Sequence, residues 1–182
     1  MRADYLLKVI ALGNGGVGKT AITRRYATNK FEHEHKITIG VDITTKEIEI
    51  DDYVAQLTIW DTGGQEAFQE LIPMYYKGAL GALVIYDITN RKSFDSVEYW
   101  VNEVKKHCSP LIPVVILVAN KQDLKDQREV DDKEGEKKAT ELSKIMGKKV
   151  LFYKTSAKNG ENINSLFETL TRRILEEYNE ED

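Results

Sequence analysis

The 182-residue sequence has one cysteine, three prolines and no long apolar run. The single Cys108 excludes an internal disulfide and a structural zinc site built from cysteines. The longest uninterrupted apolar run covers residues 114–119, far short of the roughly 20 residues that a membrane-spanning helix needs. The N-terminus has no basic stretch followed by an apolar core, so we expect no secretory signal. These absences predict a soluble, cytoplasmic protein.

An excess of basic charge is also absent. The chain carries 26 basic and 30 acidic side chains, a formal net charge of −4, which argues against nucleic-acid binding as its main task. Hydrophobic residues make up 41% of the chain, enough for a buried core. The length favours one domain over residues 1–182.

Short apolar segments alternate with segments of helical periodicity along the chain. Near-continuous apolar runs are typical of parallel strands that are covered on both faces, and helical stripes run through residues 94–104 and 163–174. Residues 41–50 and 53–60 instead indicate a hairpin. The other strands are expected at residues 5–12, 80–86, 114–119 and 150–153. The pattern predicts a three-layer α/β domain with a six-stranded, mostly parallel sheet, one antiparallel edge strand and about five helices.

Two local details are also predicted. The apolar positions of the first hairpin strand change parity between Ile43 and Ile48, which indicates a bulge or bend near Thr45. Ser93 precedes a helical stripe and is placed to cap the helix.

A glycine-rich segment directly follows the first predicted strand. Residues 13–20 fit the pattern G-x-x-x-x-G-K-[ST], in which glycines let backbone N–H groups turn toward phosphate oxygens at a helix start. Lys19 would reach the terminal phosphates and the Thr20 hydroxyl would bind Mg²⁺. A chance glycine-rich turn is the alternative, and the position between a strand and a helix counts against it. The candidate phosphate-binding residues are Gly13, Asn14, Gly15, Gly16, Val17, Gly18, Lys19, Thr20 and Ala21.

Three more polar segments follow predicted strands. Residues 61–66 begin with an Asp, which is placed to hold Mg²⁺ through water, and they continue with glycines and a Gln that could orient an attacking water. Residues 120–123 and 155–158 follow two later strands. Guanine carries a 2-amino group and an N1–H, and one carboxylate can accept hydrogen bonds from both. Adenine has no such pair of donors, so Asp123 is the candidate residue that selects guanine.

The order of these segments resembles that of the Ras superfamily of small GTPases, with the Rab branch the most similar. GNGGVGKT, Thr38, DTGGQE, NKQD and TSAK are similar to the five nucleotide-binding motifs, and TIGVD at 38–42 and YDITN at 86–90 are Rab-like. The resemblance implies a P-loop GTPase domain that binds GTP or GDP with Mg²⁺ and slowly hydrolyses GTP. It also implies a molecular switch in signalling or vesicle trafficking. Switch I is expected at about 31–41 and switch II at about 62–78.

The resemblance also implies a role for individual residues. The catalytic residues would be Lys19, Thr38, Gly64 and Gln65, of which Gln65 orients the water. Thr20, Thr38 and Asp61 would hold Mg²⁺, and Phe31 would pack against the guanine ring. The remaining base-binding residues would be Asn120, Lys121, Asp123, Ser156, Ala157 and Lys158.

Some residues depart from the family pattern. Gly63 stands where Rab and Ras proteins usually have Ala, and His35 and Ile37 replace the usual switch I residues. No arginine lies between Arg25 and Arg91, so we expect slow hydrolysis that a partner's arginine would accelerate by roughly 10³–10⁵. The implied partners of this monomer are an exchange factor, a GTPase-activating protein and effectors.

No lipid anchor is visible in the chain. It has no cysteine near its C-terminus for prenylation, and Arg2 stands where N-myristoylation needs glycine. Attachment at the periphery of membranes is therefore expected only if the native C-terminus is longer and lipidated.

Two other functions stay open at this point. One is a GTP-binding structural or adaptor module without physiological hydrolysis, against which the presence of Thr38 and Gln65 argues. The other is a P-loop nucleotide kinase, which would need an arginine-rich lid, whereas this chain has only seven scattered arginines.

Overall fold

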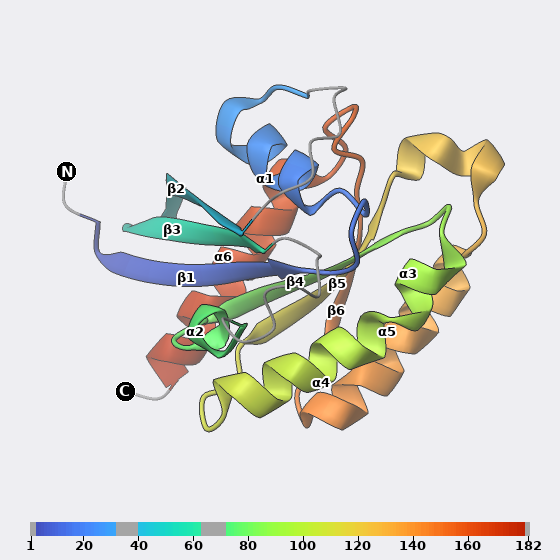
Figure 1. The fold of residues 1–182 in the computed structure, drawn as a ribbon. Helices are drawn as coiled ribbons and strands as arrows, with labels where there is room; N and C mark the ends of the chain where they lie inside the picture. Colours follow the sequence, from blue (N-terminus) through green and yellow to red (C-terminus); the bar gives the residue numbers. More distant parts are fainter. Residues whose placement is uncertain (1–2, 32–39, 63–71, 181–182) are drawn as a thin grey trace.

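The computed structural model describes residues 3–31, 40–62 and 72–180 (Figure 1). These residues form a six-stranded sheet in the order β2-β3-β1-β4-β5-β6, in which only the pair β2–β3 is antiparallel. The predicted α/β fold with one antiparallel edge strand is confirmed. The strands are β1 (Tyr5–Leu12), β2 (Val41–Ile50), β3 (Tyr53–Thr62), β4 (Gly81–Asp87), β5 (Val114–Asn120) and β6 (Leu151–Lys154).

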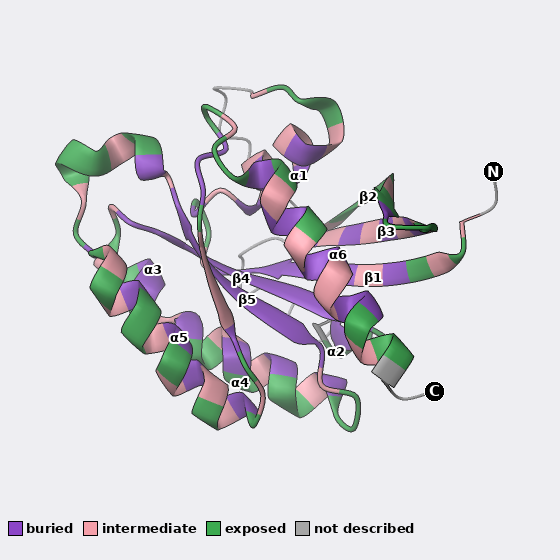
Figure 2. Cartoon of the chain, turned by 180° about the vertical axis from the view of Figure 1, so that it is seen from behind, coloured by how far each residue is buried: buried purple, intermediate pink, exposed green. Residues whose placement is uncertain are grey.

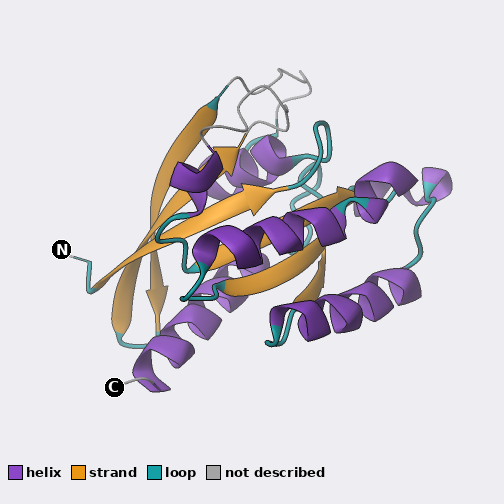
Figure 3. Cartoon of the chain, turned by 60° about the horizontal axis from the view of Figure 1, so that its bottom comes forward, coloured by secondary structure: helices purple, strands orange, loops and turns teal. Residues whose placement is uncertain are grey.

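Helices cover both faces of the sheet, which gives three layers (Figure 3). Helices α1 and α6 lie on one face, and α4 and α5 lie on the other (Figure 1). The described residues contain six α-helices and a 3₁₀ segment, close to the five helices expected, and none of these helices is long and apolar enough to cross a membrane. They are α1 (Lys19–Thr28), α2 (Ile72–Tyr76), α3 (Arg91–Asp95), α4 (Val97–Cys108), η2 (Gln122–Gln127), α5 (Asp132–Met146) and α6 (Ile163–Glu180).

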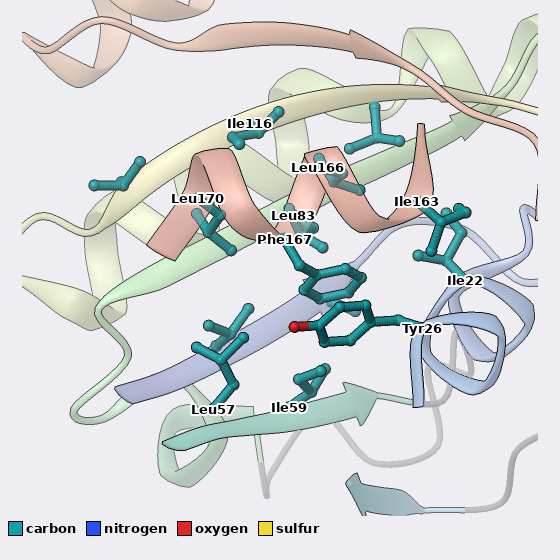
Figure 4. Packing of buried hydrophobic residues seen from close by; sticks show 14 of the residues in the cluster. Ile22, Tyr26, Leu57, Ile59, Leu83, Ile116, Ile163, Leu166, Phe167 and Leu170 are labelled. Carbon is teal, nitrogen blue, oxygen red and sulfur yellow. The ribbon is translucent and has the colours of Figure 1, made fainter. Parts of the chain in front are cut away.

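The core has two parts, one on each side of the sheet. All residues of β4 and β5 are buried (Figure 2), which explains why their sequences are almost continuously apolar. Residues of β1 alternate between the two parts, with Val9 facing α1 and α6 and Ile10 facing α4 and α5. On the α1 and α6 side, the rings of Tyr26 and Phe167 stack with their centroids 4.0 Å apart (Figure 4). This packing holds α1, and the loop before it, against the sheet.

The prediction of a bulge near Thr45 is wrong. Every residue of β2 has one partner in β3, with no residue inserted. The parity change instead places Ile43 on the solvent side of the edge strand, where it is 49% exposed, while Ile48 packs against the core on the other side. An edge strand that is only half covered tolerates such an exposed side chain, so the register does not need to shift.

Ser93 does not cap a helix from outside. Helix α3 begins after Asn90, whose side chain accepts a hydrogen bond from the Ser93 backbone N–H. Ser93 is buried within α3, and its hydroxyl oxygen accepts a 3.0 Å hydrogen bond from the Asp87 N–H. The predicted single helix is divided at Ser96, between α3 and α4.

Replacing Gly135 with alanine should destabilise the protein, although alanine favours helix by about 1 kcal/mol. A Cβ at this position of α5 would lie 2.5 Å from the Phe152 ring and 2.7 Å from the Tyr86 hydroxyl. Overpacking of this kind costs about 1–3 kcal/mol, so we expect a net loss of up to about 2 kcal/mol in the free energy of unfolding, measured in urea. Glu136→Ala, at an exposed position of the same helix, is the control. A Gly135→Ala protein that is more stable than the parent would contradict this packing.

Candidate functional site

The polar loops of the sequence analysis meet at one edge of the sheet. Strands β1, β3, β4, β5 and β6 are parallel to one another, so their carboxyl ends lie at the same edge. Ligands of open α/β sheets bind beyond this edge. The segments that begin at Gly13, Asp61, Asn120 and Thr155 all start there.

The loop from residue 13 to residue 18 needs glycine at several positions. Gly13 and Gly18 have φ values of +143° and +102°, which side chains rarely adopt. A Cβ on Gly13 would lie 2.3 Å from the Ile85 carbonyl oxygen, and one on Gly18 would lie 2.3 Å from the Asn120 side-chain nitrogen. The glycines therefore allow close contact of the loop with β4 and with the end of β5.

Lys19 is a buried cation at the first position of α1. Its Nζ donates hydrogen bonds to the carbonyl oxygens of Gly13 (2.8 Å) and Asn14 (3.0 Å), and the residue is only 6% exposed. Burial lowers the pKa of Lys19 to about 8, against an opposing effect of the nearby Asp61 carboxylate. A buried positive charge at the N-terminus of a helix suits an anionic ligand.

Asp61 and Thr20 form the second charged part of the site. Asp61 is 1% exposed, and its Oδ2 accepts a short hydrogen bond from the Thr20 hydroxyl. Its Oδ1 is buried and has no hydrogen-bond partner among the described residues. Burial raises the pKa of this carboxyl, while Thr20 and Lys19 act in the opposite direction.

An unpartnered carboxylate oxygen beside a hydroxyl fits a divalent cation with oxygen ligands. Mg²⁺ prefers such oxygens and is usually bound by one or two protein groups together with water and phosphate. The residues at Asp61 and Thr20 therefore fit a magnesium ion.

Asn120 and Lys121 tie the end of β5 to the glycine-rich loop. The Asn120 side chain donates to the Val17 carbonyl oxygen (2.9 Å) and accepts from the Thr155 hydroxyl (3.0 Å), and Asn120 is 1% exposed. Lys121 donates to the Gly16 carbonyl oxygen at 2.8 Å. Two polar side chains thus fix the distance between the glycine-rich loop and the segment that carries Asp123.

Asp123 is exposed but held in one orientation. Its Oδ1 accepts a 2.6 Å hydrogen bond from the hydroxyl of Ser156, which is completely buried. Ala157, the next residue, is 4% exposed. A carboxylate fixed at the edge of the sheet, beside buried backbone, can accept two hydrogen bonds from a planar base.

Asn14 connects the glycine-rich loop to the N-terminal part of α4. Its side chain donates to the Ser96 hydroxyl (3.0 Å) and accepts from the Trp100 indole N–H (2.9 Å). These contacts join the loop to the start of α4.

Comparisons with known proteins now decide the family. The sequence model of the Ras family matches residues 8–176. The chain belongs to the Ras family. Human Ras-related protein Rab-8B is 39% identical over 176 residues, which cover 97% of this chain and 82% of that protein. Mouse Rab-8A and the fission yeast GTP-binding protein ypt2 are each 40% identical over 171 residues, which cover 94% of this chain and 79% and 82% of those proteins.

This Ras-family chain is therefore a small GTPase of the Rab branch, an enzyme that hydrolyses GTP. The predictions that the chain is a Rab-branch small GTPase, a GTP-hydrolysing enzyme and a switch protein are confirmed by its family membership. The role of each individual site residue stays a prediction.

The other predicted site residues of this GTPase have different surroundings. Phe31 is half-buried and packs against the core beneath α1 and α6, and Ala21 also contacts this core. Lys158 is exposed, and a Cβ added to Gly15 would meet no atom within 4 Å. Thr38, Gly64 and Gln65 lie outside the described residues, as do the departures at His35, Ile37 and Gly63.

The structure adds a residue to the GTPase site that the sequence analysis did not identify. Asp87, at the end of β4, is 6% exposed, and its Oδ2 lies 2.7 Å from the Lys121 ammonium. Its Oδ1 accepts from the N–H and the hydroxyl of Thr89. The signal was present in the sequence, because Asp87 directly follows the predicted strand at residues 80–86, just as Asp61 follows the predicted strand at residues 53–60.

Proposed function

We propose that this chain binds GTP and GDP with Mg²⁺ at the glycine-rich loop and hydrolyses GTP slowly, so that two nucleotide states alternate. The observation that carries the proposal is the buried pair of opposite charges at one loop: the Lys19 ammonium, and the Asp61 carboxylate with an unpartnered oxygen. A polyphosphate with a divalent cation matches both charges, whereas an uncharged ligand matches neither.

Each described residue has a definite task in this proposal. Lys19 and the backbone N–H groups of the loop bind the phosphates, and Thr20 and Asp61 hold Mg²⁺. When bound, Mg²⁺ neutralises charge on the phosphate oxygens. Asp123, oriented by Ser156, accepts hydrogen bonds from the guanine N1–H and 2-amino groups.

Hydrolysis would depend on residues of the two switch segments. Gln65 aligns the attacking water, and Thr38 and Gly64 contact the terminal phosphate, so the segments at about 31–41 and 62–78 differ between the GTP and GDP states. Effectors then recognise the GTP state of this cytoplasmic monomer, and an exchange factor and an activating protein control the cycle. Because neither segment contains an arginine, the unaided turnover is slow.

Competition binding and turnover test the proposal directly. Purified protein is loaded with a fluorescent GDP analogue in Mg²⁺ and is titrated with GDP, GTP and ATP. We expect GDP and GTP to compete at least about a hundredfold better than ATP, because adenine leaves the Asp123 carboxylate unpaired. We also expect unaided GTP turnover below about one per second.

The outcomes separate the alternatives. Equal competition by ATP would contradict guanine recognition, and faster turnover would contradict slow hydrolysis. Tight GTP binding with no hydrolysis, and no effect of Gln65→Leu, would favour the adaptor module.

A further inference from the structure

A second hydrogen-bond network joins the segments at residues 120–123 and 155–158, here called the base-side loops. It lies on the side of these loops away from the Asp123–Ser156 contact. Arg128, directly after η2, donates from Nη2 to the Gln122 side-chain oxygen at 2.6 Å. The Gln122 side-chain nitrogen donates to the Ala119 carbonyl oxygen (3.2 Å), and its backbone N–H donates to the Thr155 carbonyl oxygen (3.0 Å). Gln122 is only 3% exposed. The residue between Lys121 and Asp123 is therefore held from outside the site by a guanidinium group.

The same arginine reaches the other base-side loop through a carboxylate. Arg128 Nη1 lies 2.7 Å from Asp132 Oδ1, and Asp132 Oδ2 lies 3.0 Å from the Lys154 ammonium. Asp132 is the first residue of α5, and Lys154 is the last residue of β6. Lys154 directly precedes Thr155, so the network runs from the segment of Asp123 to the segment of Ser156.

The backbone on both sides of Asp123 is irregular. Lys121 has a φ of +67°, and η2 is interrupted at Leu124, which has φ −97° and ψ 42°. One backbone hydrogen bond, from the Gln122 N–H to the Thr155 carbonyl oxygen, joins this segment to the segment after β6, and side-chain contacts hold the rest of it. On the inner side the Ser156 hydroxyl donates to the Asp123 carboxylate, and on the outer side Arg128 donates to the Gln122 side-chain oxygen.

We propose that Arg128 and Asp132 are positioning residues that set the selectivity of the site for guanine. They act through Gln122, which places the Asp123 carboxylate against the Ser156 segment. The planar guanidinium is suited to this task because its fork donates to Gln122 and Asp132 at the same time. The inference rests on the proposed function, since it concerns the same guanine-binding carboxylate.

The affinity for an inosine nucleotide, compared with that for GDP, measures how well Asp123 is positioned. IDP lacks the 2-amino group of GDP, so the ratio of the two affinities measures one hydrogen bond to Asp123. A purely structural role of the network at the start of α5 would lower stability and leave this ratio unchanged. A positioning role changes the ratio.

The experiment compares the Kd values for GDP and IDP, measured by competition against a fluorescent GDP analogue at fixed Mg²⁺. We expect Arg128→Ala to lower the GDP preference about three- to tenfold and Asp132→Asn to lower it less. Arg128→Lys, which keeps the charge but loses the planar fork, should lie between Arg128→Ala and the parent. Arg173→Ala is the matched control, because Arg173 pairs with Glu176 (2.8 Å) on α6, away from the base-side loops, and its ratio should not change.

The possible results distinguish a positioning role of Arg128 from a purely structural one. A ratio within twofold of the parent in Arg128→Ala, with a lower Tm, would overturn the positioning role. If Arg128→Ala does not fold, the same ratio measured in Gln122→Leu and Arg128→Lys decides the question. Failure of the parent protein to bind GDP would instead overturn the proposed function, so the two failures are distinguishable.

Discussion

Lys19→Ala is expected to lower the affinity for GDP at least about a hundredfold. Lys19 is 6% exposed and two carbonyl oxygens of the loop hold its ammonium, so the ammonium would meet a bound phosphate with little solvent between them. Charged hydrogen bonds of this kind contribute about 1.5–3 kcal/mol each, and Lys19 would make more than one. The measurement is the Kd for GDP in the presence of Mg²⁺. Lys137→Ala, at an exposed position on α5, is the control.

The lowered pKa of Lys19 adds a pH dependence to this prediction. Burial lowers the pKa of Lys19 to about 8, and the negative charge of a phosphate beside the ammonium would raise it. Below pH 8 Lys19 is already charged before binding, so GDP affinity changes little through this group. Above pH 8 binding must take up a proton, and we expect affinity to be about tenfold weaker at pH 9 than at pH 7. An affinity that is flat from pH 7 to 9 would contradict the role of a buried, titrating Lys19.

The sheet could be predicted closely because most of it is buried on both faces. The predicted strand at residues 5–12 has the observed bounds, and β5 differs by one residue. Continuous burial of β5 leaves a continuous apolar sequence, and the buried second half of β1 does the same. The edge strand β2 was less predictable. Ile43 is apolar but 49% exposed, so the apolar pattern there does not report which side faces the core.

The site motifs could be predicted because each lies on a continuous segment, whereas contacts between segments could not. Asp87 meets Lys121 because the parallel register of β4 and β5 sets Asp87 beside Asn120. Trp100 donates to Asn14 across 86 positions of sequence. These partners depend on tertiary packing, for which a single sequence contains no periodic signal.

Asp61→Asn should remove most of the effect of Mg²⁺ on nucleotide release. In the parent protein, chelation of Mg²⁺ by EDTA is expected to accelerate GDP dissociation at least about tenfold, because the cation links Asp61 and Thr20 to the phosphates. An amide keeps an oxygen for the Thr20 hydroxyl but lacks the negative charge. In Asp61→Asn we expect EDTA to change the dissociation rate less than about twofold. The measurement is the release of a fluorescent GDP analogue with and without EDTA.

The same substitution should stabilise the nucleotide-free protein. Burial raises the pKa of Asp61 above its value in an unfolded chain, so the folded state favours the neutral form. At pH 7 the charged carboxylate therefore destabilises the fold, and this cost decreases as pH falls through the pKa of the folded state. We expect a gain of about 1–3 kcal/mol in the free energy of unfolding for Asp61→Asn, with Asp52→Asn in the exposed β2–β3 turn as the control. An Asp61→Asn protein that is less stable and still responds to EDTA would contradict the assignment, because a carboxylate kept for structure loses stability on substitution, whereas one kept for a cation gains it.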